Sequence, residues 1–458
     1  MLQRDERLGT EKISKLFIRL AIPAVLAQII NLLYNIVDRI YIGHIENIGS
    51  EALTGVGVCL PIIMFISAFS SLCGMGGAPK AAIKLGENKI DDANKILSNC
   101  FSLTIIMSII LTIVFSIFGT DLLLLFGASE NTIPYASKYM SIYCLGTIFV
   151  MVSMGLASFI TTQGYSKISM IYTITGALLN IALDPLFIFA LNLGVQGAAI
   201  ATIISQAVTS VLIIRFLISK KSTLKISVKN MKLEANVILP CVLLGLAPFI
   251  MMSTESVLSI CFNTSLYKYG GDLAVGSMTI LTSLMSFAMM PLQGFTQGAQ
   301  PIISFNYGAK KPERCKKTFK ILLLTCVIYS VSFWALIMLF PKFFAGIFTE
   351  DQALIDFTAW ALRIYMFMIF IFGIQLACQQ TFISLGNAPI SLFLALLRKV
   401  ILLIPLIYIV PIFTENKCLG VFLAEPIADF IAVSTTLILF LFTFNKTMKK
   451  IDIKENNL

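Results

Sequence analysis

Two aspartates interrupt otherwise apolar stretches in the first half of the chain. Asp38 lies in "NLLYNIVDRIYIGH" (31–44), and Asp184 lies in "TITGALLNIALDP" (173–185). An ionised carboxylate is costly in apolar surroundings, and acids within a membrane are rare and usually functional. Two carboxylates held together in a low dielectric repel each other, so one takes up a proton or a cation lies between them. The pattern therefore favours a site for a proton or a hard cation such as Na⁺.

Other polar side chains share helical faces with these acids, because positions three or four residues apart lie on one face of a helix. By this spacing the faces contain Gln28, Asn31, Asn35 and Asp38; Thr173, Gly176, Asn180 and Asp184; and Thr202, Gln206 and Thr209. Counted from the outer ends of their spans, Asp38, Asn180, Asp184 and Thr202 lie roughly 8 to 15 Å deep at 1.5 Å per residue. We expect these four residues to form one cation site that could hold Na⁺.

A second interpretation of the polar residues is structural. Interhelical hydrogen bonds alone could account for four of them, namely Gln28, Asn31, Gln206 and Thr209. Arg39 is adjacent to Asp38 in sequence but about 100° away around a helix, so we expect it to extend toward the outer interface. Pro23 and Pro185 weaken the helical hydrogen bonding near the acids, which permits a kink or simply a fixed bend.

The elements that must position these residues are membrane spans. Hydrophobic residues make up 57% of the 458-residue chain and charged residues 13%, far from the composition of a soluble domain. About 20 apolar residues in a helix cross the ~30 Å hydrocarbon core. The sequence predicts twelve spans, at 17–43, 53–78, 95–118, 133–160, 167–190, 194–218, 236–267, 272–305, 318–346, 354–384, 389–412 and 418–446. No cleaved leader is expected, and the ten cysteines are expected to be free apolar side chains.

The net charge of +10 reflects membrane orientation and does not indicate a nucleic-acid partner. Lys and Arg concentrate at both ends of the chain and in alternate connections, chiefly 219–235 and 306–320. This asymmetry is the positive-inside rule, which places both termini in the cytoplasm. The expected partner of the surface is the lipid bilayer, and the basic segment 219–235 could also contact anionic lipids.

The two halves of the chain are related by an internal repeat. "GMGGAPKAAIKLGENKIDDANK" (74–95) aligns without a gap with "TQGAQPIISFNYGAKKPERCKK" (296–317), at an offset of 222 residues. Each half has an even number of spans, so both halves insert with the same orientation. We expect an all-α integral membrane protein of twelve transmembrane helices in two pseudo-twofold-related six-helix bundles, which is typical of transporters. The predicted domains are an N-terminal bundle (1–218), a cytoplasmic basic linker (219–235) and a C-terminal bundle (236–458).

The second half does not repeat the chemistry of the first. The offset takes Asp38 to Ile260 and Asp184 to Leu406, so neither acid has a counterpart. The charges within the spans of the second half are instead Glu255, Arg398, Lys399, Glu425 and Asp429. One interpretation is a buried ion-pair network that stabilises the bundle, with Arg398, Glu425 and Asp429 as candidates. The other is a second proton or substrate site.

The chain resembles the multidrug and toxic compound extrusion (MATE) family of the MOP flippase superfamily, most closely its MepA-like and DinF-like branch. The resemblance covers essentially the whole chain and rests on "LYNIVDRIYIGH", "LLNIALDPLFIF" and the glycine-proline segments after the second and eighth spans. It implies cation-coupled export of cationic, amphipathic drugs, with the coupling site at Asp38, Asn180, Asp184 and Thr202. Other branches use carboxylates in spans 7 and 10, but here span 10 has no acid in its middle.

We therefore expect a multidrug efflux antiporter of the bacterial cytoplasmic membrane, a monomer without a cofactor, that exchanges small organic cations for Na⁺ or H⁺ by alternating access. The substrate-binding candidates are Gln28, Asn31, Tyr34, Asn35, Gln206 and Glu255. The alternative is a lipid-linked saccharide flippase of the same superfamily, which should have a cavity rich in Arg and Lys. An enzyme is not expected, because the single His44 lies at an outer loop and no H-E-x-x-H, G-x-S-x-G or phosphate-loop motif occurs.

Overall fold

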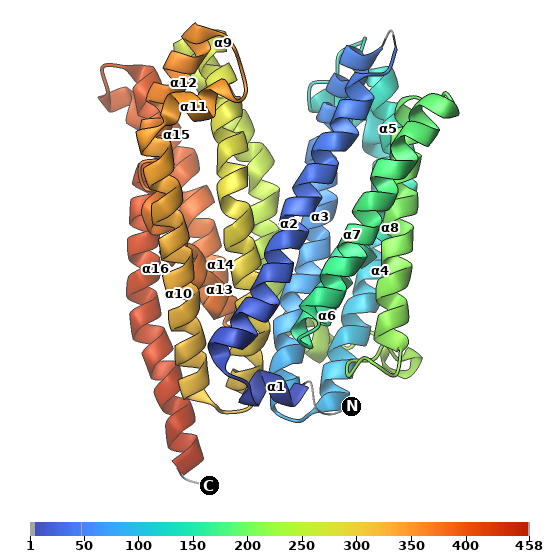
Figure 1. Ribbon diagram of the computed structural model, residues 1–458, viewed down its shortest axis with the longest axis vertical. Coiled ribbons are helices and arrows are strands. Elements are labelled where there is room, and N and C mark those ends of the chain that lie inside the picture. The colour runs from blue at the N-terminus through green and yellow to red at the C-terminus, as the bar shows by residue number, and fades with distance from the viewer. Residues whose placement is uncertain (1–4, 47, 457–458) are drawn as a thin grey trace.

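The computed structural model describes residues 5–46 and 48–456, and this part of the chain is almost entirely helical, without a strand. Figure 1 shows two groups of helices, α2–α8 and α9–α16. The two groups meet at the end where α1 and the last turns of α16 lie, and they diverge toward the opposite end. The arrangement is that of two bundles joined at one end.

The N-terminal bundle follows a short helix, α1 (Asp5–Thr10), and contains seven α-helices. They are α2 (Ile13–Gly43), α3 (Gly49–Gly86), α4 (Ile90–Leu125), α5 (Ile133–Leu145), α6 (Thr147–Thr162), α7 (Ser166–Pro185) and α8 (Val195–Ile218). A π-helix, η1 (Leu186–Ala190), follows α7 directly.

The C-terminal bundle begins after a short 3-10 helix, η2 (Val228–Asn230). Its elements are α9 (Ala235–Gly308), α10 (Pro312–Leu339), α11 (Pro341–Gly346), α12 (Gln352–Tyr365), α13 (Ile369–Ser384), α14 (Ala388–Leu396), the π-helix η3 (Leu397–Leu403), α15 (Ile404–Phe413) and α16 (Lys417–Asn456).

The predicted twelve spans are confirmed once the bends in the helices are considered. Among the described residues, nine helical segments are long and apolar enough to cross a membrane, and two bent pairs add a span each: α5–α6, bent by 58°, and α12–α13, bent by 49°. The 74 residues of α9 contain a non-helical position, Gly271, with φ 62° and ψ −157°. Divided there, α9 forms two spans, since a single helix of that length would measure about 110 Å.

Several helices extend beyond the predicted hydrocarbon limits. The α4 helix begins at Ile90 instead of residue 95, and its first turn carries Asp91 and Asp92, where carboxylates interact favourably with the positive end of the helix dipole.

One face of α4 is exposed and apolar, with Ile109, Ile113 and Ile117 at 50%, 53% and 65% exposure. Such a face is suited to contact with lipid.

Glycines bring the backbones of the two bundles together at their joined end. A Cβ atom on Gly86 would lie 2.0 Å from the carbonyl oxygen of Phe305, and one on Gly308 would lie 2.0 Å from that of Ile83. The sequence offset of 222 takes Gly86 to Gly308 and Ile83 to Phe305. The contact is therefore repeated by the pseudo-twofold relation, and each half supplies one glycine and one carbonyl group.

The short helix α1 ties the N-terminal segment to this contact. The Leu8 carbonyl oxygen accepts hydrogen bonds from the side chains of Asn306 (2.9 Å) and Arg314 (3.1 Å). The Leu8 side chain is buried at 1% exposure and lies beside Gly164 of the N-terminal bundle. Leu8 thus touches both bundles where they meet.

The predicted linker is fixed against the N-terminal bundle. The backbone N–H of Glu234 donates to the Asn99 side chain of α4 at 2.8 Å, and that of Ser227 donates to Ser98 at 3.1 Å. The Gln163 side-chain oxygen accepts from the backbone of Leu224 at 3.0 Å. These bonds hold the connection against one bundle before the chain enters α9.

Three clusters of buried apolar side chains form the core. One lies within each bundle, and the third contains residues of both, such as Leu85 and Ile303. All ten cysteines are free, as predicted, and all but Cys261 are buried.

Candidate cation-coupling site

Close packing of α7 on α8 places Asn180. A Cβ atom on Gly176 of α7 would lie 2.3 Å from the hydroxyl oxygen of Thr209 on α8, so only glycine fits without rearrangement. One turn further along α7, the Asn180 amide donates a hydrogen bond to the Thr202 hydroxyl of α8 at 3.4 Å. The same amide donates to the Asp184 carboxylate at 3.2 Å. Three of the four predicted site residues therefore lie together.

Asp38 reaches the same place from α2. Its carboxyl group lies within electrostatic range of that of Asp184, which is fully buried at 0% exposure. The neighbouring Arg39 side chain is exposed. Its charge acts on Asp38 from a distance, but no ion pair joins the two in the described part of the chain. Two acids that meet without a paired base require a proton or a cation.

Three buried oxygen atoms at the site accept no hydrogen bond from any residue that the structure describes. They are Asp38 Oδ1, Asn180 Oδ1 and Asp184 Oδ2. Buried polar atoms are seldom left unpaired, so each lone acceptor points to a missing proton donor or cation. Together with the Thr202 hydroxyl they form an oxygen-only set, which suits Na⁺ or a proton. The described residues contain no cluster of three or more His, Cys, Asp or Glu of the kind that holds a transition metal.

An irregular turn follows the site directly. Pro185 cannot donate a backbone hydrogen bond, and the next five residues form the π-helix η1. A Cβ atom on Gly197 would lie 2.6 Å from the carbonyl carbon of Phe187, so this glycine lets η1 pack on the start of α8. Single π turns within helices are frequent at functional sites.

A pair of tyrosines on α5 lines the neighbourhood of Asp38 and was not predicted as part of the site. The rings of Tyr139 and Tyr143 stack at a centroid distance of 5.9 Å, and both are buried, at 4% and 5% exposure. Tyr139 and Tyr34 of α2 both lie within electrostatic range of the Asp38 carboxylate. The regular spacing in "PYASKYMSIYC" places these tyrosines on one helical face and was the available signal.

The predicted substrate-binding residues of the N-terminal bundle have different surroundings. Gln206 accepts a hydrogen bond from the Ser153 hydroxyl of α6 and thus joins two helices. Asn35 is exposed, and its amide donates to the Asn31 carbonyl oxygen at 2.6 Å. The remaining candidates, Gln28, Asn31 and Tyr34, are half-buried along α2.

The charges of the C-terminal bundle form two adjacent groups. Arg398 donates to Asp429 and to Glu425, each at 2.7 Å, so the three ion-pair candidates are in contact. Lys399 pairs with Glu255 of α9. Glu255, a substrate-binding candidate, therefore lies next to the network and is already paired.

Sequence comparison places this geometry in a known family. The MatE family model matches the chain twice, at residues 23–186 and 248–409. The chain belongs to the MATE family of multidrug efflux transporters. Multidrug export protein MepA of Staphylococcus haemolyticus is 25% identical over 409 residues, which is 89% of each chain. MepA of Staphylococcus saprophyticus is 25% identical over 463 residues, covering 99% of this MATE chain and 100% of the relative.

Solved MATE structures share the fold over nearly the whole chain. The MATE multidrug transporter DinF-BH, solved in complex with a small organic compound, is 35% identical, with a TM-score of 0.88 over 96% of this chain and 98% of that one. A MATE crystal structure in the bent conformation gives a TM-score of 0.91 at 22% identity, over 98% and 99% of the two chains. This MATE protein is accordingly a multi-pass membrane transporter with bacterial relatives.

Proposed function

We propose that this transporter exports cationic, amphipathic compounds in exchange for Na⁺ or H⁺, and that Asp38, Asn180, Asp184 and Thr202 bind the coupling cation. The proposal depends on one observation above all, the meeting of two carboxyl groups from α2 and α7 without a paired base. Such a site is stable only while a proton or cation neutralises it. A coupling cation that enters from one side of the membrane and leaves to the other can therefore drive a conformational cycle.

The α2 helix connects the cation site to the contact between the bundles. One end of α2 carries Asp38, and a segment nearer its other end packs against the C-terminal bundle, where a Cβ atom on Gly298 would lie 2.5 Å from the Cα atom of Ala21. Pro23 lies within α2 and removes one helical hydrogen bond, so bending is easiest near it. Binding of a cation at Asp38 would therefore alter a helix that also holds the bundles together.

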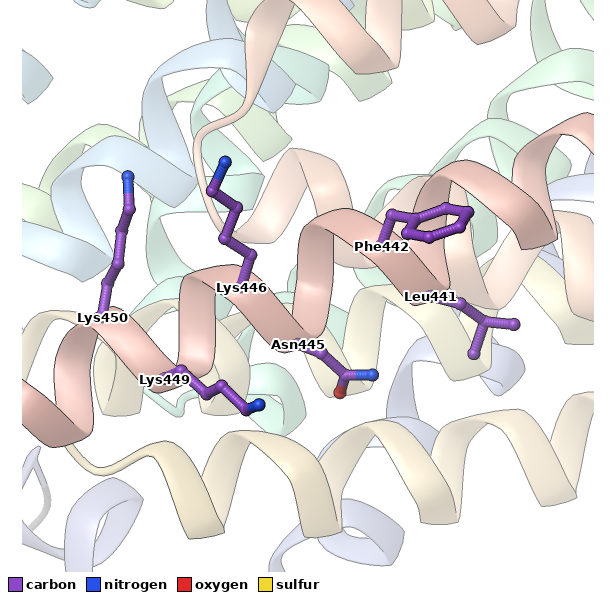
Figure 2. A pocket seen from close by; sticks show the side chains of 6 residues that line it. All are labelled: Leu441, Phe442, Asn445, Lys446, Lys449 and Lys450. Carbon is purple, nitrogen blue, oxygen red and sulfur yellow. The ribbon is translucent and has the colours of Figure 1, made fainter.

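We assign the joined end of the bundles to the cytoplasm. That end carries the basic connection 219–235 and the last turns of α16, from which three lysines extend in Figure 2. A shallow hollow of about 600 Å³ on this helix is lined by Leu441, Phe442, Asn445, Lys446, Lys449 and Lys450. Apolar side chains followed by lysines are typical of a helix that leaves the hydrocarbon on the cytoplasmic side. Both termini are then cytoplasmic, and the diverging end faces outward.

The facing surfaces of the bundles offer an aromatic environment for an organic cation. Phe65 and Phe69 of α3 contact Phe249 of α9, at ring-centroid distances of 6.1 and 4.9 Å. Met252 of α9 accepts a hydrogen bond from Ser71 in the same region. Aromatic rings and flexible methionines adapt to ligands of different shape. The solved relative DinF-BH binds a small organic compound, and we propose that this transporter takes small organic cations of aromatic character.

The membrane potential drives this exchange only when more positive charge enters than leaves, because a one-for-one exchange of monovalent cations moves no net charge. One elementary charge that moves inward through 100 mV releases about 2.3 kcal/mol. At about 1.4 kcal/mol per tenfold change, an exchange of two coupling cations for one monovalent drug cation therefore gains a drug concentration ratio of about fifty from the potential. A chemical gradient of Na⁺ or H⁺ adds to this ratio.

The test is ethidium efflux from membrane vesicles energised separately with a sodium gradient or a proton gradient. Asp38→Asn and Asp184→Asn should each abolish gradient-driven efflux, because either change removes one of the two carboxylates. Asp121→Asn is the matched control, since Asp121 is exposed near the end of α4 in the same bundle. Efflux that persists unchanged in both site variants contradicts the proposed coupling site.

The same vesicles distinguish the flippase alternative. Translocation of a labelled lipid carrier without movement of any organic cation would favour a lipid-linked saccharide flippase. A pyrophosphate-bearing carrier requires several Arg or Lys side chains, whereas the described candidate site contains two acids. We accordingly favour drug export by a monomer that needs no cofactor, in the bacterial cytoplasmic membrane.

A further inference from the structure

The buried charges of the C-terminal bundle do not balance. Arg398 is the shared partner of Glu425 and Asp429, and the three side chains are 11%, 5% and 3% exposed. Lys399, from the same π-helix, is already paired with Glu255. With both carboxyl groups ionised, the group of Arg398, Glu425 and Asp429 would hold one uncompensated negative charge away from water, which is strongly unfavourable.

The surroundings of this acid pair supply no other neutralising charge. The ionisable groups nearest to it are Lys399 of η3, Glu255 of α9 and Tyr365 of α12. The Lys399–Glu255 pair is neutral as a unit, and a phenol is neutral. The α13 helix contributes the ring of Phe372, 4.5 Å from the Arg398 guanidinium, and the uncharged Gln375. The excess charge therefore belongs to Glu425 and Asp429 themselves.

We propose that Glu425 and Asp429 share one bound proton, so that the C-terminal bundle contains a protonation site separate from Asp38 and Asp184. The two acids are four residues apart on α16, hence on one helical face, and the guanidinium of Arg398 reaches both. One proton makes the group of Arg398, Glu425 and Asp429 electrically neutral. A metal ion fits less well, because Arg398 already occupies one oxygen of each acid and the described residues form no cluster of three metal-ligating side chains.

A small hollow lies beside this site, next to Arg398. It has a volume of about 10 Å³, enough for about one water molecule, and Gln375, Arg398 and Lys399 are among its lining residues. Gln375 is 1% exposed, and its Nε2 atom donates to no described residue. Lys399 also contacts Glu255, whose side chain is 58% exposed. The hollow therefore places room for about one water molecule and an amide donor without a described acceptor beside Arg398, the shared partner of the two acids.

Infrared spectroscopy of the purified full-length protein in lipid nanodiscs tests the bound proton. The protein carries Asp38→Asn and Asp184→Asn, so that the proposed coupling site contributes no signal, and it is measured at neutral pH, where exposed carboxyl groups are ionised. The carbonyl stretch of one protonated carboxylic acid should remain. Adding either Glu425→Gln or Asp429→Asn should remove it, because Arg398 then balances the one remaining carboxylate. Adding Glu313→Gln, the control at an exposed acid of the same bundle, should leave it, because that carboxylate is ionised at neutral pH.

Thermal unfolding separates this proposal from a fully ionised ion-pair network. With a shared proton, Glu425→Gln and Asp429→Asn each keep the group neutral, so each single variant should retain the unfolding midpoint of the natural chain. The double variant leaves Arg398 buried and unpaired, and its midpoint should fall. A fully ionised network predicts no protonated acid and a higher midpoint for each single variant, because each variant would remove the uncompensated negative charge, and that result overturns the proposal. Neither measurement requires transport, so loss of efflux in Asp38→Asn does not affect the outcome.

Discussion

Alanine at Gly86 or Gly308 should shift the transporter away from the state in which its bundles meet at the joined end, the proposed cytoplasmic end. The added methyl group would lie 2.0 Å from a backbone carbonyl oxygen, whereas ordinary contacts begin at 3.4 Å. The obstacle is backbone, so no side-chain rotation relieves it, and the helices must separate by about 1.4 Å. Overpacking of this kind costs about 1–3 kcal/mol.

This cost predicts a measurable change in population. At about 1.4 kcal/mol per tenfold change, the equilibrium between closed and open cytoplasmic ends should shift by roughly 5- to 150-fold toward the open one. Both single variants should behave alike because the pseudo-twofold relation exchanges the two contacts. The double variant should shift the equilibrium by less than the sum of the two effects, since a single separation of the bundles relieves both clashes.

Electron-spin distance measurements between labels at Asp91 and Glu313, one exposed position on each bundle, report this separation in a cysteine-free background. The control is Gly57→Ala in α3, where an added Cβ atom meets nothing within 4 Å. The label distance should lengthen in Gly86→Ala and Gly308→Ala and stay constant in the control. A distance distribution that is the same in all variants, or that changes in only one of the two site variants, refutes the symmetric closure described here.

Three further predictions concern single side chains. Thr202→Val removes one oxygen ligand, so it should raise the Na⁺ concentration for half-maximal efflux about tenfold and leave proton-driven efflux unchanged. Equal effects on sodium-driven and proton-driven efflux would show that Thr202 does not bind Na⁺. Leu8→Ala should weaken cytoplasmic closure by about 2–5 kcal/mol, measured with the same labels, whereas Ile18→Ala, at a side chain 54% exposed, should not. Arg398→Met should cost about 3–5 kcal/mol of stability. Lys342→Met breaks an exposed ion pair and should leave the unfolding midpoint nearly unchanged. Similar midpoints for the two variants would contradict the predicted difference between the buried and the exposed ion pair.

The twelve spans were predictable because the length of an apolar run is a local property of the sequence. The bend between α5 and α6, close to Gly146, was not, because it depends on packing: a Cβ atom there would lie 2.3 Å from the Ile203 side chain of α8. The π-helices η1 and η3 were also missed. Pro185 indicated a weak helix, but the extra residue in the turn is set by how η1 fits against α8.

The grouping of Asp38, Asn180, Asp184 and Thr202 came from depth and helical phase. In a membrane protein the topology fixes the depth of each residue, and the period of the helix fixes the face on which it lies. Only the packing of one helix against another is then unknown. Tyr139 was missed because nothing in the sequence states that a side chain of α5 lies within electrostatic range of Asp38. In the second half the contact of Arg398 with Glu425 and Asp429 matches the candidate network, whereas the pairing of Lys399 with Glu255 was not predicted.

The contrast between the two bundles explains how one site could control both. The glycine contacts obey the repeat, because Gly86 and Gly308 each pack on a carbonyl group of the opposite half. Opening at the joined end therefore breaks both contacts together, which favours two discrete states over gradual deformation. The acids do not obey the repeat, since Ile260 and Leu406 replace them in the second half. The contact between the bundles is symmetric, but the acids lie in one bundle only. A single cation bound at α2 is therefore enough to favour one of the two states.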